Sequence, residues 1–166
     1  KAAKLYQANI IIRITGDCPL ISPSIIEKLI DFFIAENIDY AYTSQQFAEG
    51  LDCEIFTYEA LKKSHHNAKK KSEREHITQF IKNNPKEFKF LSLDNKNDEG
   101  MYRITVDEKE DFEVVKNIIE NFNKKNIDFY EFDEIKEYLD SNIGIKKINE
   151  RIKRNQGLYN SILEEK

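Results

Sequence analysis

Hydrophobic and polar residues follow one another in a pattern that predicts strands alternating with helices. The first apolar run, Asn9–Thr15 (NIIIRIT), holds four isoleucines in seven residues, which favours a strand buried on both faces, as in a parallel sheet. Gly16 ends this strand. Ser22 then offers an N-cap and Pro23 suits the first helical position, so we expect a helix that runs to about Glu36. Its apolar stripe comprises Ile25, Ile26, Leu29, Ile30 and Phe33.

The rest of the chain continues this alternation. Further strands are expected at Asp39–Thr43, Cys53–Thr57, Phe88–Leu93 and Tyr102–Val106. Further helices are expected at Tyr58–Ala68, Asp107–Asn123 and Glu131–Leu139, and between the capping-box pattern of Ser72 with Glu75 and the stop at Pro85. The pattern indicates one mixed α/β sheet with helices on both faces. We assign residues 1–142 to this α/β domain and residues 143–166 to a helical C-terminal tail.

Composition narrows the class of protein. The 166 residues favour one domain, or most of one, and 40% hydrophobic with 34% charged residues is ordinary for a globular protein. The net charge of -4 disfavours nucleic acid as a partner, and no apolar run approaches the roughly 20 residues of a membrane-spanning helix. Cys18 and Cys53 show no metal-binding spacing, so we expect reduced thiols, no zinc and a cytoplasmic protein.

Two aspartates follow predicted strands directly and are the best candidates for chemistry. Ligands of open α/β sheets bind beyond the carboxyl ends of the strands, where Asp17 and Asp107 are expected. Mg²⁺ favours one or two carboxylates together with phosphate oxygens and water, so this pair is a candidate magnesium site. The alternatives stay open: Asp17 also suits a local turn before Pro19, and Asp107 with Glu110 suits a helix cap.

Two further segments concentrate polar residues. The loop Glu49–Glu54 places acids around Gly50, where they could receive sugar hydroxyls or simply surround a glycine turn. Ser72–His76 combines acid, base and imidazole at a helix start. Arg74 could bind a carboxylate or phosphate with two hydrogen bonds, or the segment is a well-capped surface helix.

The order of these motifs resembles a known family. The motifs are RITGDCPLISP (Arg13–Pro23), EGLDCEIF (Glu49–Phe56), SEREH (Ser72–His76), RITVDEKEDFE (Arg103–Glu113) and RNQGLY (Arg154–Tyr159). The chain resembles, over nearly its whole length, the spore-coat polysaccharide biosynthesis, cytidylyltransferase-like family. That family is similar to the acylneuraminate and 3-deoxy-manno-octulosonate cytidylyltransferases.

The resemblance implies a Rossmann-like nucleotide-diphosphosugar-transferase fold. It also implies transfer of a cytidylyl group from CTP to a sugar acid hydroxyl, with Mg²⁺ and release of pyrophosphate, for surface polysaccharide or glycan biosynthesis. Asp17 and Asp107 match the family's metal-binding aspartates. The residues that the resemblance suggests for substrate binding are Arg13, Asp52, Glu54, Arg74, Glu75 and His76.

Two departures from the family pattern affect these expectations. Lys109 stands where the family usually has proline before the Glu-Asp pair. The family also opens with a first βα unit and a glycine- and arginine-containing loop that grips the nucleotide, and this sequence has neither. We therefore expect a fragment that by itself binds CTP poorly and is inactive.

Two other functions remain open from the sequence. The first is a glycosyltransferase of the same fold that uses a nucleotide sugar. The second is a non-catalytic assembly module, because Ile145, Ile148 and Ile152 recur at helical spacing and could form the seam of a homodimer. Packing of these isoleucines on their own domain explains the spacing equally well.

Overall fold

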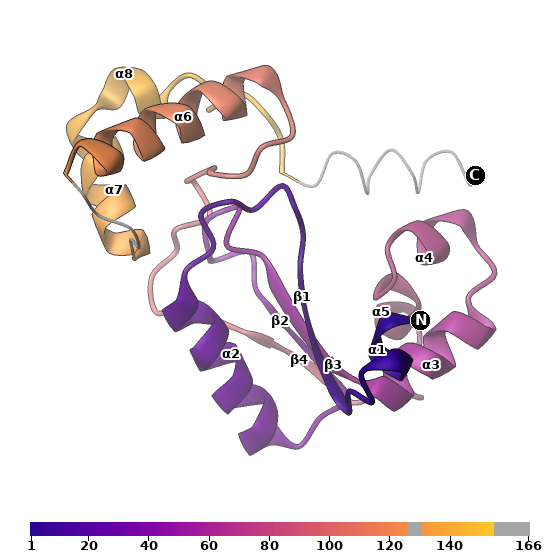
Figure 1. Cartoon of the computed structure of the whole chain (residues 1–166). Helices are drawn as coiled ribbons and strands as arrows, with labels where there is room; N and C mark the ends of the chain where they lie inside the picture. The colour runs from indigo at the N-terminus through magenta and orange to yellow at the C-terminus, as the bar shows by residue number, and fades with distance from the viewer. Residues whose placement is uncertain (126–130, 155–166) are drawn as a thin grey trace.

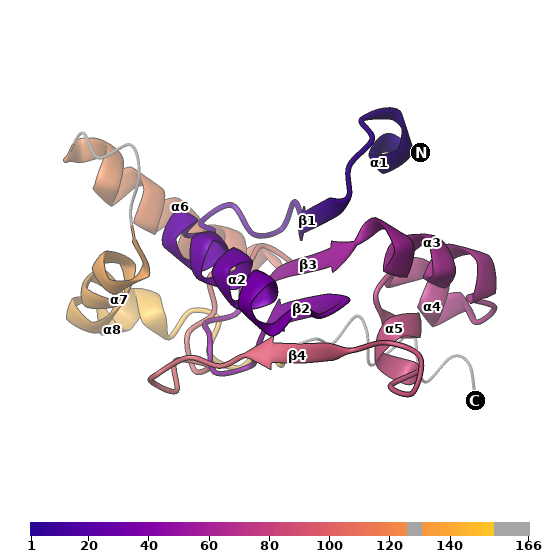
Figure 2. The same ribbon diagram turned by 90° about the horizontal axis from the view of Figure 1, so that it is seen from below.

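A four-stranded mixed sheet lies at the centre of the protein. The structure, a computed structural model, describes residues 1–125 and 131–154. The strands β1 (Ile10–Ile14), β2 (Tyr40–Thr43), β3 (Cys53–Thr57) and β4 (Phe90–Leu93) are arranged in the order β1-β3-β2-β4. Strand β3 is antiparallel to both β1 and β2, whereas β2 and β4 are parallel. Figure 2 shows this order directly. The predicted mixed α/β sheet is confirmed.

Helices cover both faces of this sheet (Figure 1). On one face, α2 (Pro23–Glu36) buries Leu29 and Phe33 against Ile55. On the other face, Phe80 and Phe56 belong to a second cluster that also draws on α3 (Tyr58–Asn67). The same side carries the short helices α4 (Lys71–Glu75) and α5 (Gln79–Asn83). A four-residue helix, α1 (Ala2–Leu5), precedes β1.

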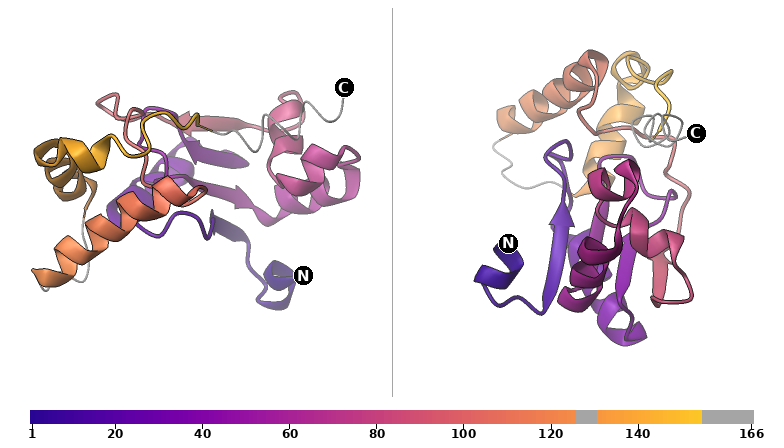
Figure 3. Two further views of the ribbon diagram at one scale, coloured as in Figure 1. Left: turned by 90° about the horizontal axis from the view of Figure 1, so that it is seen from above. Right: turned by 90° about the vertical axis from the view of Figure 1, so that its right-hand side faces the viewer.

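A third group of helices lies beyond the end of β1. It consists of α6 (Lys109–Lys124), α7 (Phe132–Ser141) and α8 (Ile143–Lys146). Figure 3 shows this group and α3–α5 at opposite ends of the sheet. No helix among the described residues is both long and apolar enough to cross a membrane.

The prediction that β1 is buried on both faces is wrong. Within the described residues β1 pairs only with β3, in antiparallel orientation, and forms an edge of the sheet. Ile10, Ile12 and Ile14 lie on one face of β1 and remain 49%, 39% and 43% exposed. A run of isoleucines predicts a strand, but it does not reveal how many neighbours that strand has.

The predicted helix from Ser72 to Pro85 is two helices. Helix α4 has Lys70 as its N-cap, two residues before the predicted cap, and ends at Glu75 with His76 as its C-cap. Ser72 is buried inside the helix and is not its cap. The Thr78 hydroxyl donates to Glu54 on β3, 2.7 Å away, which draws the chain towards the sheet between α4 and α5.

The predicted strand at Tyr102–Val106 is also wrong. With the other described residues, this segment forms a single parallel bridge, between Arg103 and Glu49. The following helix has Glu108 as its N-cap and Asp111 at the third position, so the expected capping pair of Asp107 and Glu110 is displaced by one residue. The buried Arg103 side chain binds Asp111, and this pairing determines the register of the cap.

The described part of the C-terminal tail lies against the domain. Ile145 and Ile148 pack, partly buried, against the hydrophobic cluster that contains Ile135 and Leu139. This packing uses two of the three isoleucines of the predicted homodimer seam. In its described part, the predicted helical tail is helical only over α8, and its residues 155–166 lie outside the described residues.

Candidate functional site

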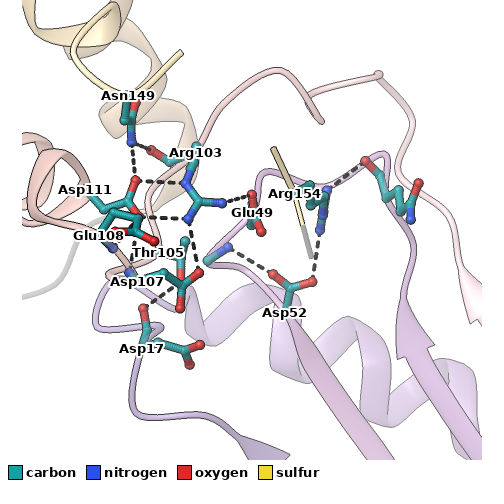
Figure 4. A network of polar contacts seen from close by, with 12 residues as sticks. Asp17, Glu49, Asp52, Arg103, Thr105, Asp107, Glu108, Asp111, Asn149 and Arg154 are labelled. Carbon is teal, nitrogen blue, oxygen red and sulfur yellow. Dashed lines mark hydrogen bonds and ion pairs between the residues drawn. The ribbon is translucent and has the colours of Figure 1, made fainter. Parts of the chain in front are cut away.

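The structure brings Asp17 and Asp107 together. The turn after β1 is joined to the segment before α6, because the Asp17 carbonyl accepts hydrogen bonds from the Thr105 hydroxyl (3.0 Å) and the Val106 amide (2.8 Å). Asp107 therefore lies beside Asp17 (Figure 4). Burial raises the pKa of Asp107, the Arg103 guanidinium opposes this shift, and the nearby charge of Asp17 adds to it. The Asp107 side chain is still 48% exposed, so the pair is open to a ligand.

The guanidinium of Arg103 holds this edge in place. It donates two hydrogen bonds to the fully buried Asp111, from Nε (2.8 Å) and Nη2 (2.7 Å). Nη1 pairs with Glu49, and Nη2 also reaches Asp107 at 3.1 Å. Burial would raise the pKa of Asp111, but hydrogen bonds from Arg103 and Asn149 outweigh it and hold that pKa below its ordinary value. Arg103 thus pairs with the carboxylates of Glu49, Asp107 and Asp111 and holds Asp107 at the site.

Asp111 also organises the start of α6. Its Oδ2 accepts the backbone amides of Asp107 (3.1 Å) and Glu108 (3.0 Å), while Asn149 donates to Oδ1 at 2.9 Å. A buried carboxylate with this many donors stays ionised. The backbone around Asp107 is therefore fixed before any ligand binds.

Asp52, predicted to bind substrate, has structural partners on both of its oxygens. Oδ1 accepts from Nη2 of Arg154 at 2.9 Å, and Oδ2 accepts from the Gly50 amide at 3.0 Å. Arg154 also donates to the carbonyls of Gln45 (3.0 Å) and Phe47 (2.8 Å). Arg154 and Asp52 thus clamp the loop that leads into β3. The Asp52 side chain is 43% exposed, so its edge remains accessible.

Arg13 and Glu54, two further predicted substrate-binding residues, contact each other. Arg13 Nη1 lies 2.6 Å from Glu54 Oε2, on the face of the sheet that α3–α5 cover. Burial would raise the pKa of Glu54, but hydrogen bonds from Tyr40 and Thr78 outweigh it and the pKa is lowered. Glu54 is therefore an ionised anchor for Arg13.

The remaining predicted substrate residues lie on and after α4. Arg74 and Glu75 are exposed, and His76 is the half-buried C-cap residue of α4. In residues 1–125 and 131–154, no hydrogen bond or ion pair joins Arg74 or His76 to Asp17, Asp107 or Glu54. The Nε2 atom of His76 is buried without a hydrogen-bond partner among the described residues.

The donor chemistry at Asp17 and Asp107 suits a magnesium ion. The described residues contain no group of three or more His, Cys, Asp or Glu side chains that could enclose a metal. Mg²⁺ does not need such a group, because it usually keeps several waters and takes one or two carboxylates together with substrate phosphates. Two adjacent, partly exposed carboxylates fit that preference.

Sequence reasoning missed the residues that support this pair. Glu49 and Asn149 are far from Arg103 in the chain, and Arg103 itself stood at the start of a predicted strand. The available signal was one arginine in an apolar run, four and eight residues before Asp107 and Asp111. That spacing does not by itself reveal a buried ion-pair network.

Comparisons with known proteins agree with this architecture. Residues 1–161 match the family model described as cytidylyltransferase. The uncharacterized protein MJ1063 of Methanocaldococcus jannaschii is 37% identical over 156 residues, which make up 92% of this chain and 62% of that protein. The spore coat polysaccharide biosynthesis protein SpsF of Bacillus subtilis is 27% identical over 126 residues, 70% of this chain and 49% of SpsF.

A solved structure is similar as well. A cytidylyltransferase from Leptospira borgpetersenii serovar Hardjo-bovis superposes with a TM-score of 0.79 at 35% identity, covering 88% of this chain and 62% of that one. The chain thus spans about half to three fifths of the length of the relatives that it matches. The resemblance and the Rossmann-like fold predicted from the sequence are confirmed, and the chain belongs to the cytidylyltransferase family.

Proposed function

We propose that this protein is a nucleotidyltransferase that activates a sugar acid with CTP, and that Asp17 and Asp107 bind the magnesium ion of the reaction. The observation that carries the proposal is the junction of the β1 turn with the segment before α6, which places two partly exposed aspartates side by side. Membership of the cytidylyltransferase family supports CTP as the nucleotide.

The reaction needs positioning and charge stabilisation more than covalent help from the protein. A hydroxyl oxygen of the acceptor attacks the α-phosphorus of CTP, the bond from that phosphorus to the bridging oxygen breaks, and pyrophosphate leaves. The hydroxyl proton passes to water. A magnesium ion held by Asp17 and Asp107 would supply positive charge at the phosphate oxygens. Arg103 acts through Asp107 and is a positioning residue, because its guanidinium is buried among carboxylates.

The pathway is proposed from a relative. The SpsF protein of Bacillus subtilis is named for spore coat polysaccharide biosynthesis. We propose that the product here, a cytidylylated sugar acid, likewise serves the synthesis of a surface polysaccharide or glycan.

Pyrophosphate release tests this function. The protein, in the full length that its gene encodes, is incubated with CTP, Mg²⁺ and a panel of nonulosonic and octulosonic acids, beside a known cytidylyltransferase. Asp17→Asn and Asp107→Asn should each lower the rate by more than about 100-fold, since loss of a residue that merely orients a metal ligand already costs 10–100-fold. Asp31→Asn, on the exposed side of α2, is the matched control and should retain the wild-type rate.

Two results would count against the proposal. One is no pyrophosphate from the full-length wild-type protein under conditions in which the known enzyme is active. The other is a thermal shift with a UDP-sugar but none with CTP, which would favour a glycosyltransferase of the same fold. A ligand at 100 times its Kd stabilises a protein by about 2.7 kcal/mol, so such a shift is readily measured.

A further inference from the structure

A row of polar side chains crosses the sheet one residue before β1 ends. Arg13 on β1 and Tyr42 on β2 are both register partners of Glu54 on β3. Partners in adjacent antiparallel strands point to the same face, so the three side chains share one face of the sheet. It is the face against which α5 packs.

Lys82 of α5 extends over this row. Its Nζ lies 4.1 Å from the ring centroid of Tyr42 and 5.6 Å from that of Tyr40. The two tyrosine rings are stacked, with centroids 5.2 Å apart and an interplanar angle of 20°. Such an aromatic platform attracts an ammonium and keeps it in one place.

The carboxylate of Glu54 already accepts three hydrogen bonds. Oε1 accepts from the hydroxyls of Tyr40 (2.6 Å) and Thr78 (2.7 Å), and Oε2 accepts from Arg13 (2.6 Å). Lys82 Nζ forms an ion pair with Oε1 at 4.0 Å but lies beyond hydrogen-bond distance of it. Arg13 and Lys82 thus share one carboxylate, Glu54, because Asp52, the other carboxylate that acts on Lys82, is itself paired with Arg154.

The unused donors of this cluster face partly towards solvent. Neither the Lys82 ammonium nor the Tyr42 hydroxyl donates a hydrogen bond to any residue in the described part of the chain. The side chains of Lys82 and Arg13 are 34% and 33% exposed. Burial lowers the pKa of Lys82 although Glu54 and Asp52 oppose the shift. A partly desolvated cation without a hydrogen-bond acceptor gains from an anionic ligand.

We propose that Arg13, Lys82 and Tyr42 form a subsite for the carboxylate of the acceptor sugar, with Glu54 as the residue that positions Arg13. The proposal rests on the proposed function and adds specificity-determining residues to it. Asp17 follows Arg13 by four residues, so their Cα atoms lie within about 14 Å. The proposal requires a sugar acid held at this subsite to extend towards Asp17 and Asp107. Phosphate oxygens offer similar chemistry, and the experiment separates the two anions.

Calorimetric titration without turnover tests the subsite. The ligands are N-acetylneuraminate and 3-deoxy-manno-octulosonate, their neutral methyl esters, and Mg²⁺ with CTP in a separate titration. At least one acid should bind tenfold or more tightly than its ester, a difference of about 1.4 kcal/mol. Lys82→Met should weaken binding of that acid tenfold or more and leave its ester and CTP within twofold. Lys82→Arg should restore most of the affinity.

A matched control variant shows whether an effect is specific to Lys82. Lys62→Met removes an exposed lysine of α3 and should leave the affinities for the acids, their esters and CTP unchanged. Acid binding that is unchanged in Lys82→Met, or acids that bind no better than their esters, would overturn the subsite even if the protein turns over CTP. Weakened CTP binding in Lys82→Met would assign the cation to nucleotide phosphate instead. Conversely, Lys82-dependent acid binding without cytidylyl transfer would keep the subsite and reject the proposed function.

Discussion

The buried guanidinium of Arg103 is the position at which a substitution should cost the most stability. Arg103→Met keeps the length and most of the apolar stem of the side chain but removes the cation. The change leaves Asp111, which is 0% exposed, and Glu49, whose side chain is 10% exposed, without their shared partner. Removing one partner of a buried ion pair typically costs about 3–5 kcal/mol, because an uncompensated charge remains.

Thermal unfolding and urea denaturation both measure this loss. A domain of this size loses about 2–4 °C of Tm per kcal/mol, so the expected decrease is roughly 6–20 °C. The midpoint of unfolding should fall while the m-value stays constant, since the surface exposed on unfolding is unchanged. The control Lys116→Met breaks the exposed pair with Glu120 and should cost less than about 0.5 kcal/mol.

A second substitution separates the charge from the packing. In the double variant Arg103→Met with Asp111→Asn, the buried charge of Asp111 is removed while a side-chain oxygen can still accept the amides of Asp107 and Glu108, so part of the stability should return. Wild-type stability in Arg103→Met, or a double variant that is less stable than the two single losses predict, would refute the assignment of Arg103 as the central cation of this network.

Two other predictions concern Gly50, in the loop before β3, and the carboxylate of Glu54 on β3. Gly50 has φ +105°, and a Cβ there would lie 2.6 Å from the backbone carbon of Ile104. Gly50→Ala should therefore lower the free energy of unfolding by roughly 2–5 kcal/mol, measured by thermal unfolding. The control Gly144→Ala has open space around the new methyl group and should not destabilise the protein. A smaller cost than 1 kcal/mol would contradict the close approach of the two backbones. The pKa of Glu54 is lower in the folded state, so its stabilising contribution is present above the ordinary pKa of glutamate and is lost as the pH falls through the lowered value. Thr78→Val removes one hydrogen bond to Glu54 and should flatten the acid limb of a stability-against-pH curve; an unchanged limb would show that Glu54 does not dominate it.

The elements that the sequence predicts correctly are those whose signals lie within the element itself. The position of Pro23 at the start of α2 and the spacing of Val115, Ile118 and Phe122 in α6 depend on residues within a few turns. Such elements were predicted nearly to their ends. The edge position of β1 could not be predicted, because the number of strands beside it is not encoded in its own run of isoleucines.

The residues of the candidate site likewise fall into those that the sequence predicts and those that it does not. The meeting of Asp17 and Asp107 was expected from two strand-end positions and from the order of the family motifs, although the segment before Asp107 is no regular strand. Arg103 and Lys82 were not found, because their partners are brought together only by the tertiary structure. Lys82, which contacts Tyr42, lies on α5, the second of the two helices into which the predicted single helix is divided.

The central claim is that Asp17 and Asp107 together bind the divalent ion of a nucleotidyltransferase, and electron paramagnetic resonance of bound Mn²⁺ tests it most directly. In the presence of CTP, the wild-type protein and Asp31→Asn should bind Mn²⁺ with the same affinity. Asp17→Asn and Asp107→Asn should each weaken that binding at least tenfold. Equal Mn²⁺ affinity in all four proteins would contradict the account.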